Sequence, residues 1–368
     1  MKSHTLARLE AGWRPLAVRL PPWLALGAYS QGRRVFLGRF ARQPPKHAFE
    51  PEGLQRQLWG LEFRAPLFNA AGMFKNGDGY GVTRGQGAGA YLAGTTTHTP
   101  RSGNCRRGIT QPFAPYPTSG GASNWLGLPN QGHRRVAARL ARLDKQPGFP
   151  IGASLATDTT GSEEQRLREL VRGLGLYQEA GVDFLEVNES CPNTEDGEQG
   201  MAALEHRLTV IAETFLERRT RPLPVIVKLS CDTEVAQVPA LVDALLERGF
   251  DGVNFGNTST AYTTHREAIQ PAERRLFDTF TKNFGGGVSG RPLKHDSLAL
   301  ATAAVDHVRQ RDPGHEFHVL RTGGVEDAED VRKSLDAGVA LCQWYTAYFE
   351  AFGRHGHDLY KELYGHLG

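Results

Sequence analysis

The sequence predicts an α/β protein built as a (β/α)8 TIM barrel with a short helical extension at its N-terminus. From about residue 65 onwards, short apolar runs of strand length are separated by longer helix-like segments, as a parallel sheet requires. There are eight such runs, the number that closes a barrel of this kind. The stretches that could carry chemistry follow these runs, at the end of the barrel where enzymes of this fold have their active sites.

The eight predicted strands cover residues 66–70, 90–95, 150–155, 183–188, 224–229, 251–255, 317–322 and 339–345. Helix signals stand between them. The clearest helix, 162–181, opens with a capping box formed by Ser162 and Gln165 and closes on Gly181. Further helices are predicted over 234–249 with an interruption at Pro239, over 326–338, and from about residue 347.

The first forty-odd residues differ from the rest, because Trp13, Trp23 and Leu24 are mixed with scattered arginines. A basic and aromatic amphipathic segment is typical of a membrane surface. The alternative is a helical extension that packs on the main domain, and the two are compatible. We therefore predict an N-terminal extension over residues 1–50 and a barrel domain over residues 51–368.

Residues 262–285 form a long polar insertion after the sixth predicted strand, longer than a typical connection. The composition predicts a lid or a surface loop with a short helix.

Composition and charge narrow the range of partners. The net charge of +3 is small and dispersed, whereas nucleic-acid binding usually needs a concentrated basic face. The four cysteines contain no C-x-x-C pair and no spacing typical of a metal site or a disulfide framework. No run approaches the roughly 18 apolar residues of a membrane span, and no signal-peptide core is present. We expect a protein of the cytoplasm that binds neither metal nor nucleic acid.

Candidate functional residues stand at the carboxyl ends of the predicted strands. Each alone has a structural explanation, since glycines serve turns and asparagines cap helices. Their common position at one end of a barrel favours a functional site. In chain order, the candidates are 69–81 with Lys75, 94–104, Asn188, Cys191, Lys228, Asn257, Thr258, 322–324, Tyr345 and Thr346.

Lys228 lies within the apolar strand VIVKLS, and a cation buried there needs an anionic partner, because an unpaired buried charge is costly. A bound cofactor would supply that partner. Glycines after the late strands offer backbone N–H groups where barrels commonly hold a phosphate. These glycines are Gly286, Gly287, Gly290, Gly323 and Gly324.

Residues 285–290, GGGVSG, match the letters of the dinucleotide fingerprint G-x-G-x-x-G. No predicted strand precedes them, and Arg291 and Pro292 follow where a long crossover helix should open. We interpret the segment as a phosphate-cradling turn of a barrel.

Cys191 is the cysteine placed at a strand end among polar groups. A thiol acts as a general base or nucleophile where its surroundings favour the thiolate. Because no histidine can be paired with Cys191 from the sequence, proton abstraction is favoured over hydrolase chemistry. Cys342 lies within a predicted strand and is expected in the core.

The ordered motifs of the chain resemble those of the dihydroorotate dehydrogenases, flavoenzymes that oxidise dihydroorotate to orotate in pyrimidine synthesis. The resemblance covers about residues 53–352. The motifs follow in family order as AAGMFKNG, GTTTHTPRSGN, NWLGLPNQG, VNESCPNT, PVIVKLS, GNTST, GGVSGRPL, RTGGV and QWYTA. One such motif would be weak evidence, whereas the ordered set is specific.

The resemblance implies FMN at the barrel mouth, with Lys228 facing the flavin edge where negative charge gathers on reduction. The cofactor contacts would be Ala71, Gly72, Thr95, Ser154, Asn188, Lys228 and Gly256, and on the phosphate side Ser289, Gly290, Gly323, Gly324, Tyr345 and Thr346. The substrate contacts would be Lys75, Asn124, Gly127, Leu128, Asn188, Asn193, Asn257 and Thr258. Amides suit a planar ring of alternating N–H and C=O groups. Cys191 would take the C5 proton while the C6 hydride passes to the flavin.

Two acceptors are compatible with the motifs. Cys191 and NWLGLPN are similar to the soluble class 1 enzymes, which favours fumarate or another soluble oxidant. Lys75, the GTTTHTPRSGN segment and the N-terminal extension are similar to the class 2 enzymes, which favours quinone at the inner face of a membrane. We favour quinone. Two other readings are a related flavin barrel with another substrate and a non-catalytic barrel; the set of asparagines argues against the first, and Lys75, Cys191 and Lys228 against the second.

Overall fold

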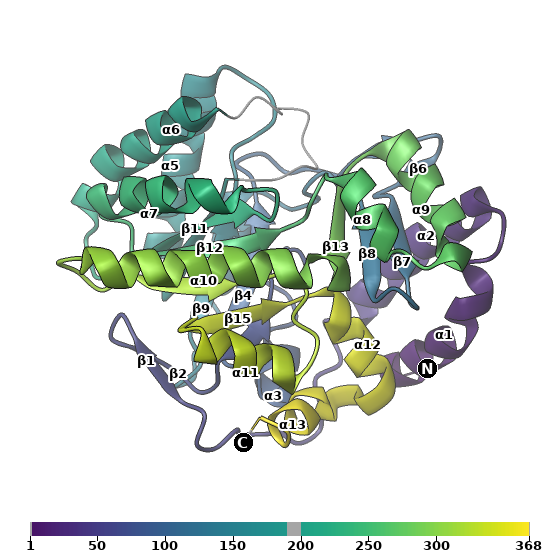
Figure 1. Ribbon diagram of the computed structural model, residues 1–368. Coiled ribbons are helices and arrows are strands. Elements are labelled where there is room, and N and C mark those ends of the chain that lie inside the picture. The colour runs from purple at the N-terminus through teal and green to yellow at the C-terminus, as the bar shows by residue number, and fades with distance from the viewer. Residues whose placement is uncertain (1, 190–199, 368) are drawn as a thin grey trace.

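Eight parallel strands form the barrel that the sequence predicts. The computed structural model describes residues 2–189 and 200–367. In it the barrel strands follow one another in the order β3-β15-β14-β12-β11-β10-β9-β4, and helices such as α7 (Val238–Glu247) and α10 (Lys294–Arg311) lie outside them (Figure 1). Each strand overlaps one of the eight predicted runs. They are β3 (Leu67–Asn69), β4 (Tyr91–Thr96), β9 (Ile151–Leu155), β10 (Phe184–Asn188), β11 (Val225–Ser230), β12 (Gly252–Asn257), β14 (His318–Arg321) and β15 (Leu341–Trp344).

A buried side-chain amide helps to join the first barrel strand to the second. The Asn69 side chain donates from Nδ2 to the carbonyl oxygen of Leu92 at 2.8 Å and accepts from the Leu92 N–H at 3.2 Å. It thereby makes the pair of bonds that a strand backbone would make, next to the backbone bond from Gly89 to Leu67. Asn69 is fully buried, so both of its polar ends need these partners.

The predicted crossover helices are confirmed. Ser162 caps α5 by accepting a hydrogen bond from the backbone N–H of Gln165. The interruption at Pro239 marks the first turn of α7, where proline needs no N–H partner. The helices around the barrel are α3 (Tyr80–Gln86), α4 (His133–Leu140), α5 (Glu163–Glu179), α6 (Met201–Thr214), α7 (Val238–Glu247), α10 (Lys294–Arg311), α11 (Ala328–Asp336), α12 (Thr346–His355) and α13 (Leu359–Tyr364).

A small antiparallel sheet stands beside the barrel mouth, and the sequence did not reveal it. Its strands are β7 (Phe113–Tyr116), β8 (Gly121–Asn124) and β13 (Gly287–Gly290), in the order β13-β8-β7. The prediction of a turn over 285–290 is therefore wrong, because most of that segment pairs with β8. A short 3-10 turn, Arg291–Leu293, and the long helix α10 then follow, so Pro292 does not prevent a crossover helix.

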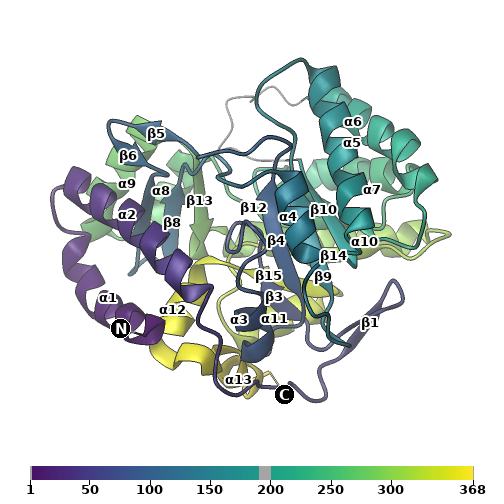
Figure 2. The same ribbon diagram turned by 180° about the vertical axis from the view of Figure 1, so that it is seen from behind.

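The insertion after the sixth barrel strand is two helices, α8 (Tyr262–Ala268) and α9 (Pro271–Phe284), not a surface loop. Leu276, Phe277 and Phe280 are buried in an apolar cluster that includes Tyr116 of β7. These apolar residues recur with the period of a helix, but the many polar residues between them made the segment resemble a loop in the sequence. Figure 2 shows α9 beside β8 and the N-terminal helices.

The N-terminal extension is helical, as predicted, and packs on the barrel. It consists of α1 (Ser3–Ala17) and α2 (Pro22–Phe40). Phe40 is fully buried, and its ring centroid lies 4.6 Å from that of Phe352 in α12. The two helices lie at one side of the barrel next to α12 and α9 (Figures 1 and 2). The boundary at residue 50 stays a prediction.

Among the described residues, no helix has both the length and the apolar character needed to cross a membrane.

Candidate active site

A cavity opens at the carboxyl ends of the barrel strands, under the small antiparallel sheet. It brings together most of the residues singled out in the sequence. The predicted residues that line it are Ala71, Gly72, Lys75, Thr95, Asn124, Leu128, Asn188, Lys228, Gly256, Asn257, Thr258, Ser289, Gly290, Gly323, Gly324, Tyr345 and Thr346. We call this cavity the mouth.

Of the described residues that the resemblance assigned to cofactor or substrate, two do not line the mouth. Gly127 lies in the loop after β8, where its carbonyl accepts a hydrogen bond from Arg101 at 3.0 Å. Ser154 is fully buried in β9, below the lining. Cys191 and Asn193 lie outside the described residues.

Several lining residues were not predicted from the sequence, because they lie in the small sheet or at inward positions of β15 and its surroundings. Phe113 comes from β7, and Gln343 comes from β15. The period-2 pattern of the eighth strand could have revealed Gln343, since a buried amide within an apolar strand stands out. Ala70 and Thr322 also line the mouth and fall within the predicted stretches 69–81 and 322–324. The missed lining residues are Phe113, Leu126, Leu293, Val325, Gln343, Trp344 and Ala347.

Glycines let three backbone segments approach one another on one side of the mouth. A Cβ on Gly256 would lie 1.6 Å from the carbonyl oxygen of Thr322, and one on Gly290 would lie 2.3 Å from that of Gly120. A Cβ on Gly324 would lie 2.4 Å from the Cα of Lys294, and all three glycines have a positive φ. These positions exclude side chains and leave backbone groups at the surface of the mouth.

Helix α12 begins on the same side. Its N-cap, Tyr345, makes no side-chain cap hydrogen bond, and Thr346 and Ala347 line the mouth. The N–H groups of a first helical turn and the helix dipole favour an anion. Glycines and helix start together fit a phosphate group.

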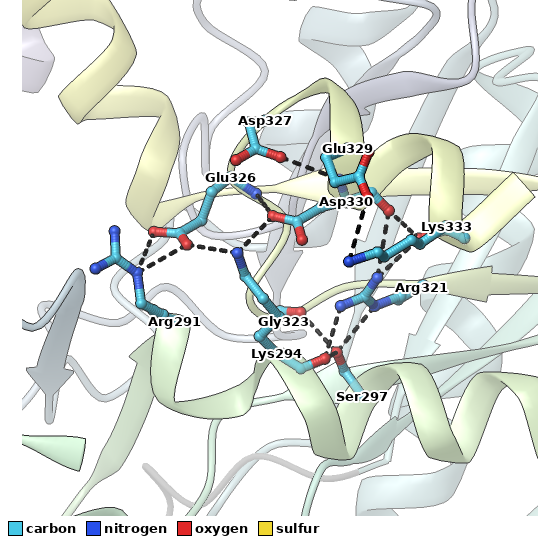
Figure 3. Close-up of polar contacts among 11 residues, drawn as sticks. Arg291, Lys294, Ser297, Arg321, Gly323, Glu326, Asp327, Glu329, Asp330 and Lys333 are labelled. Carbon is cyan, nitrogen blue, oxygen red and sulfur yellow. Dashed lines mark hydrogen bonds and ion pairs between the residues drawn. The ribbon is translucent and has the colours of Figure 1, made fainter. Parts of the chain in front are cut away.

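The loop with the paired glycines Gly323 and Gly324 is held from behind by a buried arginine (Figure 3). Arg321 donates from Nε to Ser297 Oγ at 3.0 Å and from Nη2 to the carbonyl oxygen of Lys294 at 2.8 Å, and Ser297 in turn donates to the carbonyl oxygen of Gly323 at 2.7 Å. Desolvation lowers the pKa of the Arg321 guanidinium. This network fixes the loop on which an anion would rest.

Lys294, at the start of α10, holds the turn that follows Gly324 in the chain. Its ammonium lies 2.8 Å from Glu326 Oε2 and 2.8 Å from Asp330 Oδ2. Figure 3 shows this lysine between the two carboxylates, with Arg291 on the far side of Glu326.

Below the glycines, a layer of polar side chains crosses the barrel interior. Lys228 is buried, and its Nζ lies 3.3 Å from Gln343 Oε1 and 3.9 Å from Glu186 Oε1. The prediction that a buried cation at this position needs an anionic partner holds, but the chain itself supplies one in Glu186. This glutamate lies in the run FLEVN, where no signal in the sequence marked it as the partner.

Two asparagines, at the ends of β10 and β12 on either side of β11, orient each other toward the mouth. Asn257 donates from Nδ2 to Asn188 Oδ1 at 2.8 Å, and Asn188 donates to Thr95 Oγ1 at 3.2 Å. The hydroxyl oxygen of Thr258 is buried without a hydrogen-bond partner among the described residues. Preoriented amides and an open hydroxyl are suited to a small planar polar ligand.

A second cavity, of about 570 Å³ and largely apolar, lies between the N-terminal helices and the barrel. It adjoins the mouth, since Phe113, Tyr345, Thr346 and Ala347 line both. Arg33 of α2 reaches the shared wall and donates to the Tyr345 hydroxyl at 2.7 Å.

The described cysteines offer no reactive thiolate in the mouth. Cys342 is buried in the core, as predicted, and Cys231 is buried behind Gly323. Burial raises the pKa of both thiols, so they stay protonated. Cys105 is exposed in the hairpin of β5 (Cys105–Arg106) and β6 (Ile109–Thr110).

Comparisons with known proteins show what this chain is similar to. Residues 53–365 match the family model described as dihydroorotate dehydrogenase. A relative named dihydroorotate dehydrogenase (quinone) from Parvibaculum lavamentivorans is 30% identical over 91% of this chain and 87% of its own length. A relative of the same name from Synechococcus sp. is 30% identical over 80% of this chain and 74% of its own length. A crystal structure of DHODH from Eimeria tenella in complex with ferulenol has the same fold, with a TM-score of 0.74, 20% identity, and coverage of 92% of this chain and 90% of that one.

Proposed function

Because the chain belongs to the dihydroorotate dehydrogenase family, we propose that it oxidises dihydroorotate to orotate with FMN as its flavin and a quinone as its electron acceptor. The family consists of flavin-dependent oxidoreductases of pyrimidine synthesis. The observation that carries the proposal is the mouth itself, in which a phosphate cradle, a buried lysine and a set of oriented amides converge at one end of the barrel.

FMN is the form of flavin that suits this mouth. The cradle formed by Gly290, Gly323, Gly324 and the start of α12 provides for one phosphate. FMN carries a single phosphate, whereas a dinucleotide would need a second such cradle. When bound, the flavin supplies the two-electron carrier between the two half-reactions.

The remaining cofactor contacts follow from the same arrangement. Ala71, Gly72 and Thr95 would line the ring, and Lys228 would face the edge where negative charge gathers on reduction. Ser154 would contribute indirectly by holding the side chain of Thr95, because the two hydroxyl oxygens lie 3.0 Å apart.

Dihydroorotate would bind among residues that ring the same opening. Lys75 offers a cation for the substrate carboxylate. Asn257 and Asn188 offer amide groups, and Thr258 offers the buried hydroxyl. The proposed set is completed by Asn124, Gly127, Leu128 and Asn193. Cys191 would remove the proton from C5 as the double bond between C5 and C6 forms.

The proposed quinone would occupy the apolar cavity beneath α1 and α2. Its contact with the mouth through Tyr345 and Phe113 brings an apolar ligand close to the flavin position. Most of the large exposed apolar side chains lie around this region, and Trp13, Leu16 and Leu24 are each more than half exposed. An apolar rim beside a basic helix suits peripheral contact with a membrane.

The test of the proposed reaction is anaerobic mixing of the purified flavin-loaded protein with dihydroorotate. We expect rapid bleaching of the flavin absorbance, because the substrate reduces the flavin before any acceptor is needed. If the flavin-loaded protein stayed oxidised with dihydroorotate, the proposed substrate would be wrong, whereas the fold and the proposed cofactor would be unaffected.

The acceptor can be tested by filling the apolar cavity. A Gly32→Phe variant adds a ring where a Cβ meets no atom within 4 Å and where Gly32 lines the cavity. We expect the KM for a short-chain quinone to rise at least tenfold, while reduction of the flavin by dihydroorotate stays unchanged.

The matched control is Gly38→Phe, which introduces the same side chain on the same helix. A Cβ on Gly38 also meets no atom within 4 Å, and Gly38 does not line the cavity. If Gly32→Phe left the KM for quinone unchanged and fumarate supported turnover, a soluble acceptor would be favoured. The cysteine at position 191 is also typical of enzymes with a soluble acceptor.

A further inference from the structure

Glu186 is a buried carboxylate in the barrel interior that the proposed reaction does not use. It is fully buried in the middle of β10. Residues of a strand alternate between its two faces, so Glu186 shares the inward face with Asn188, which lines the mouth. A carboxylate in such a place is costly unless it is ion-paired and hydrogen-bonded.

Three described side chains donate hydrogen bonds to the Glu186 carboxylate. Ser154 donates to Oε1 at 3.0 Å, and the side-chain amides of Asn254 and Gln343 donate to Oε2 at 2.9 Å each. A protonated carboxyl would bring a hydrogen to one of these oxygens and compete with a donor.

Gln343 links this carboxylate to Lys228. Its amide nitrogen donates to Glu186, and its oxygen accepts from the ammonium of Lys228 at 3.3 Å. Lys228 and Glu186 lie 3.9 Å apart directly. The hydroxyl of Thr322 lies 3.1 Å from the same amide oxygen, so the Gln343 side chain is held in one orientation. A rotated amide would turn its oxygen toward the carboxylate.

We propose that Glu186 is a positioning residue that holds the ammonium of Lys228 and offsets its charge, and so lowers the reduction potential of the bound flavin. The proposal rests on the proposed function in one respect, the placement of the flavin above Lys228. A lone lysine there would stabilise the reduced, more negative flavin. With Glu186 beside it, the pair is close to neutral and stabilises that form less.

This arrangement has opposite consequences for the two half-reactions. A lower potential makes reduction by dihydroorotate less favourable and transfer of electrons to the acceptor more favourable. Glu186→Gln keeps the size of the side chain and removes its charge. We therefore expect it to raise the potential, speed reduction of the flavin by dihydroorotate, and slow its reoxidation by quinone.

The experiment is a redox titration of the flavin-loaded full-length protein with a chemical reductant and a reference dye. In Glu186→Gln, we expect the equilibrium between oxidised and reduced flavin to shift at least tenfold toward the reduced form, which corresponds to about 30 mV for a two-electron couple. Glu186→Asp keeps the charge, and its potential is expected to lie closer to the parent value.

Glu273→Gln is the matched control. Glu273 is equally buried and is also held by donors, the backbone N–H groups of Thr118 and Ser119 at 2.9 and 3.0 Å, but it lies in α9, outside the barrel. Its potential should equal that of the parent. An unchanged or lower potential in flavin-loaded Glu186→Gln would overturn the proposal.

A second measurement covers the case in which Glu186→Gln does not retain its flavin. Removing one member of a buried charge pair leaves the other uncompensated, whereas removing both relieves that cost. The unfolding temperature of Glu186→Gln/Lys228→Met should therefore exceed that of both single variants. A double variant less stable than either would refute the pairing. Because neither measurement uses dihydroorotate, a failure of the proposed substrate would be seen separately.

Discussion

Replacing Cys191 with alanine is expected to slow reduction of the flavin by dihydroorotate by about 10²- to 10⁴-fold, the usual contribution of a general base. The C5 proton of dihydroorotate would have no acceptor in the variant, so formation of the double bond would stall. Flavin content should be preserved, because the phosphate cradle and Lys228 are formed by other segments. Anaerobic stopped-flow absorbance measures the rate, and the spectrum before mixing gives the flavin content.

Cys105→Ala serves as the control for thiol removal, since Cys105 is exposed in a hairpin and does not line the mouth. Its rate of flavin reduction should match that of the parent. A Cys191→Ala variant that is reduced at the parent rate would show that another group removes the proton.

The second large effect is expected at Gly256, where β12 ends beside the loop that follows β14. Gly256→Ala would place a Cβ 1.6 Å from the carbonyl oxygen of Thr322, on a backbone with φ of +129°. Neither backbone segment can yield without disturbing the barrel, because Thr322 also donates to Phe255 at 2.8 Å. We expect a loss of about 3 kcal/mol or more in the free energy of unfolding, with loss of bound flavin. Thermal unfolding and flavin absorbance of the purified variant check both.

The comparison variant is Gly314→Ala, in the loop between α10 and β14, where a Cβ would meet no atom within 4 Å. It should unfold at the parent temperature and keep its flavin. If Gly256→Ala behaved in the same way, the close approach of β12 to Thr322 could not be what requires glycine.

The barrel could be predicted because its signal is local. Each apolar run, such as 224–229, forms a strand whose residues are buried on both faces. Each crossover helix can be recognised by its apolar period and its caps, such as Ser162 at the start of α5. The small sheet escaped notice because its strands are short and come from distant segments. Asn124 in β8 meets Gly287 in β13 only after the chain has passed through most of the barrel.

The candidate site likewise contains residues that the sequence could predict and contacts that it could not. Fold geometry places strand ends at one face, so Asn188, Lys228 and Asn257 could be recognised from their positions in the sequence. Their partners could not, because a hydrogen bond between side chains on different strands depends on register and inward direction. Gln343, the link between Lys228 and Glu186, lies more than a hundred residues away along the chain from either.

By itself, the sequence determined the barrel, the face that carries the site and the need of Lys228 for an anionic partner, because these depend on periodicity, strand order and residue type. The family resemblance came from the ordered motifs, such as AAGMFKNG and RTGGV, and not from these patterns. The tertiary structure decided which anion that partner is, how the glycines meet, and where the N-terminal helices enclose an apolar cavity. Pairing and enclosure are contacts between distant segments, and those contacts exist only once the chain has closed on itself.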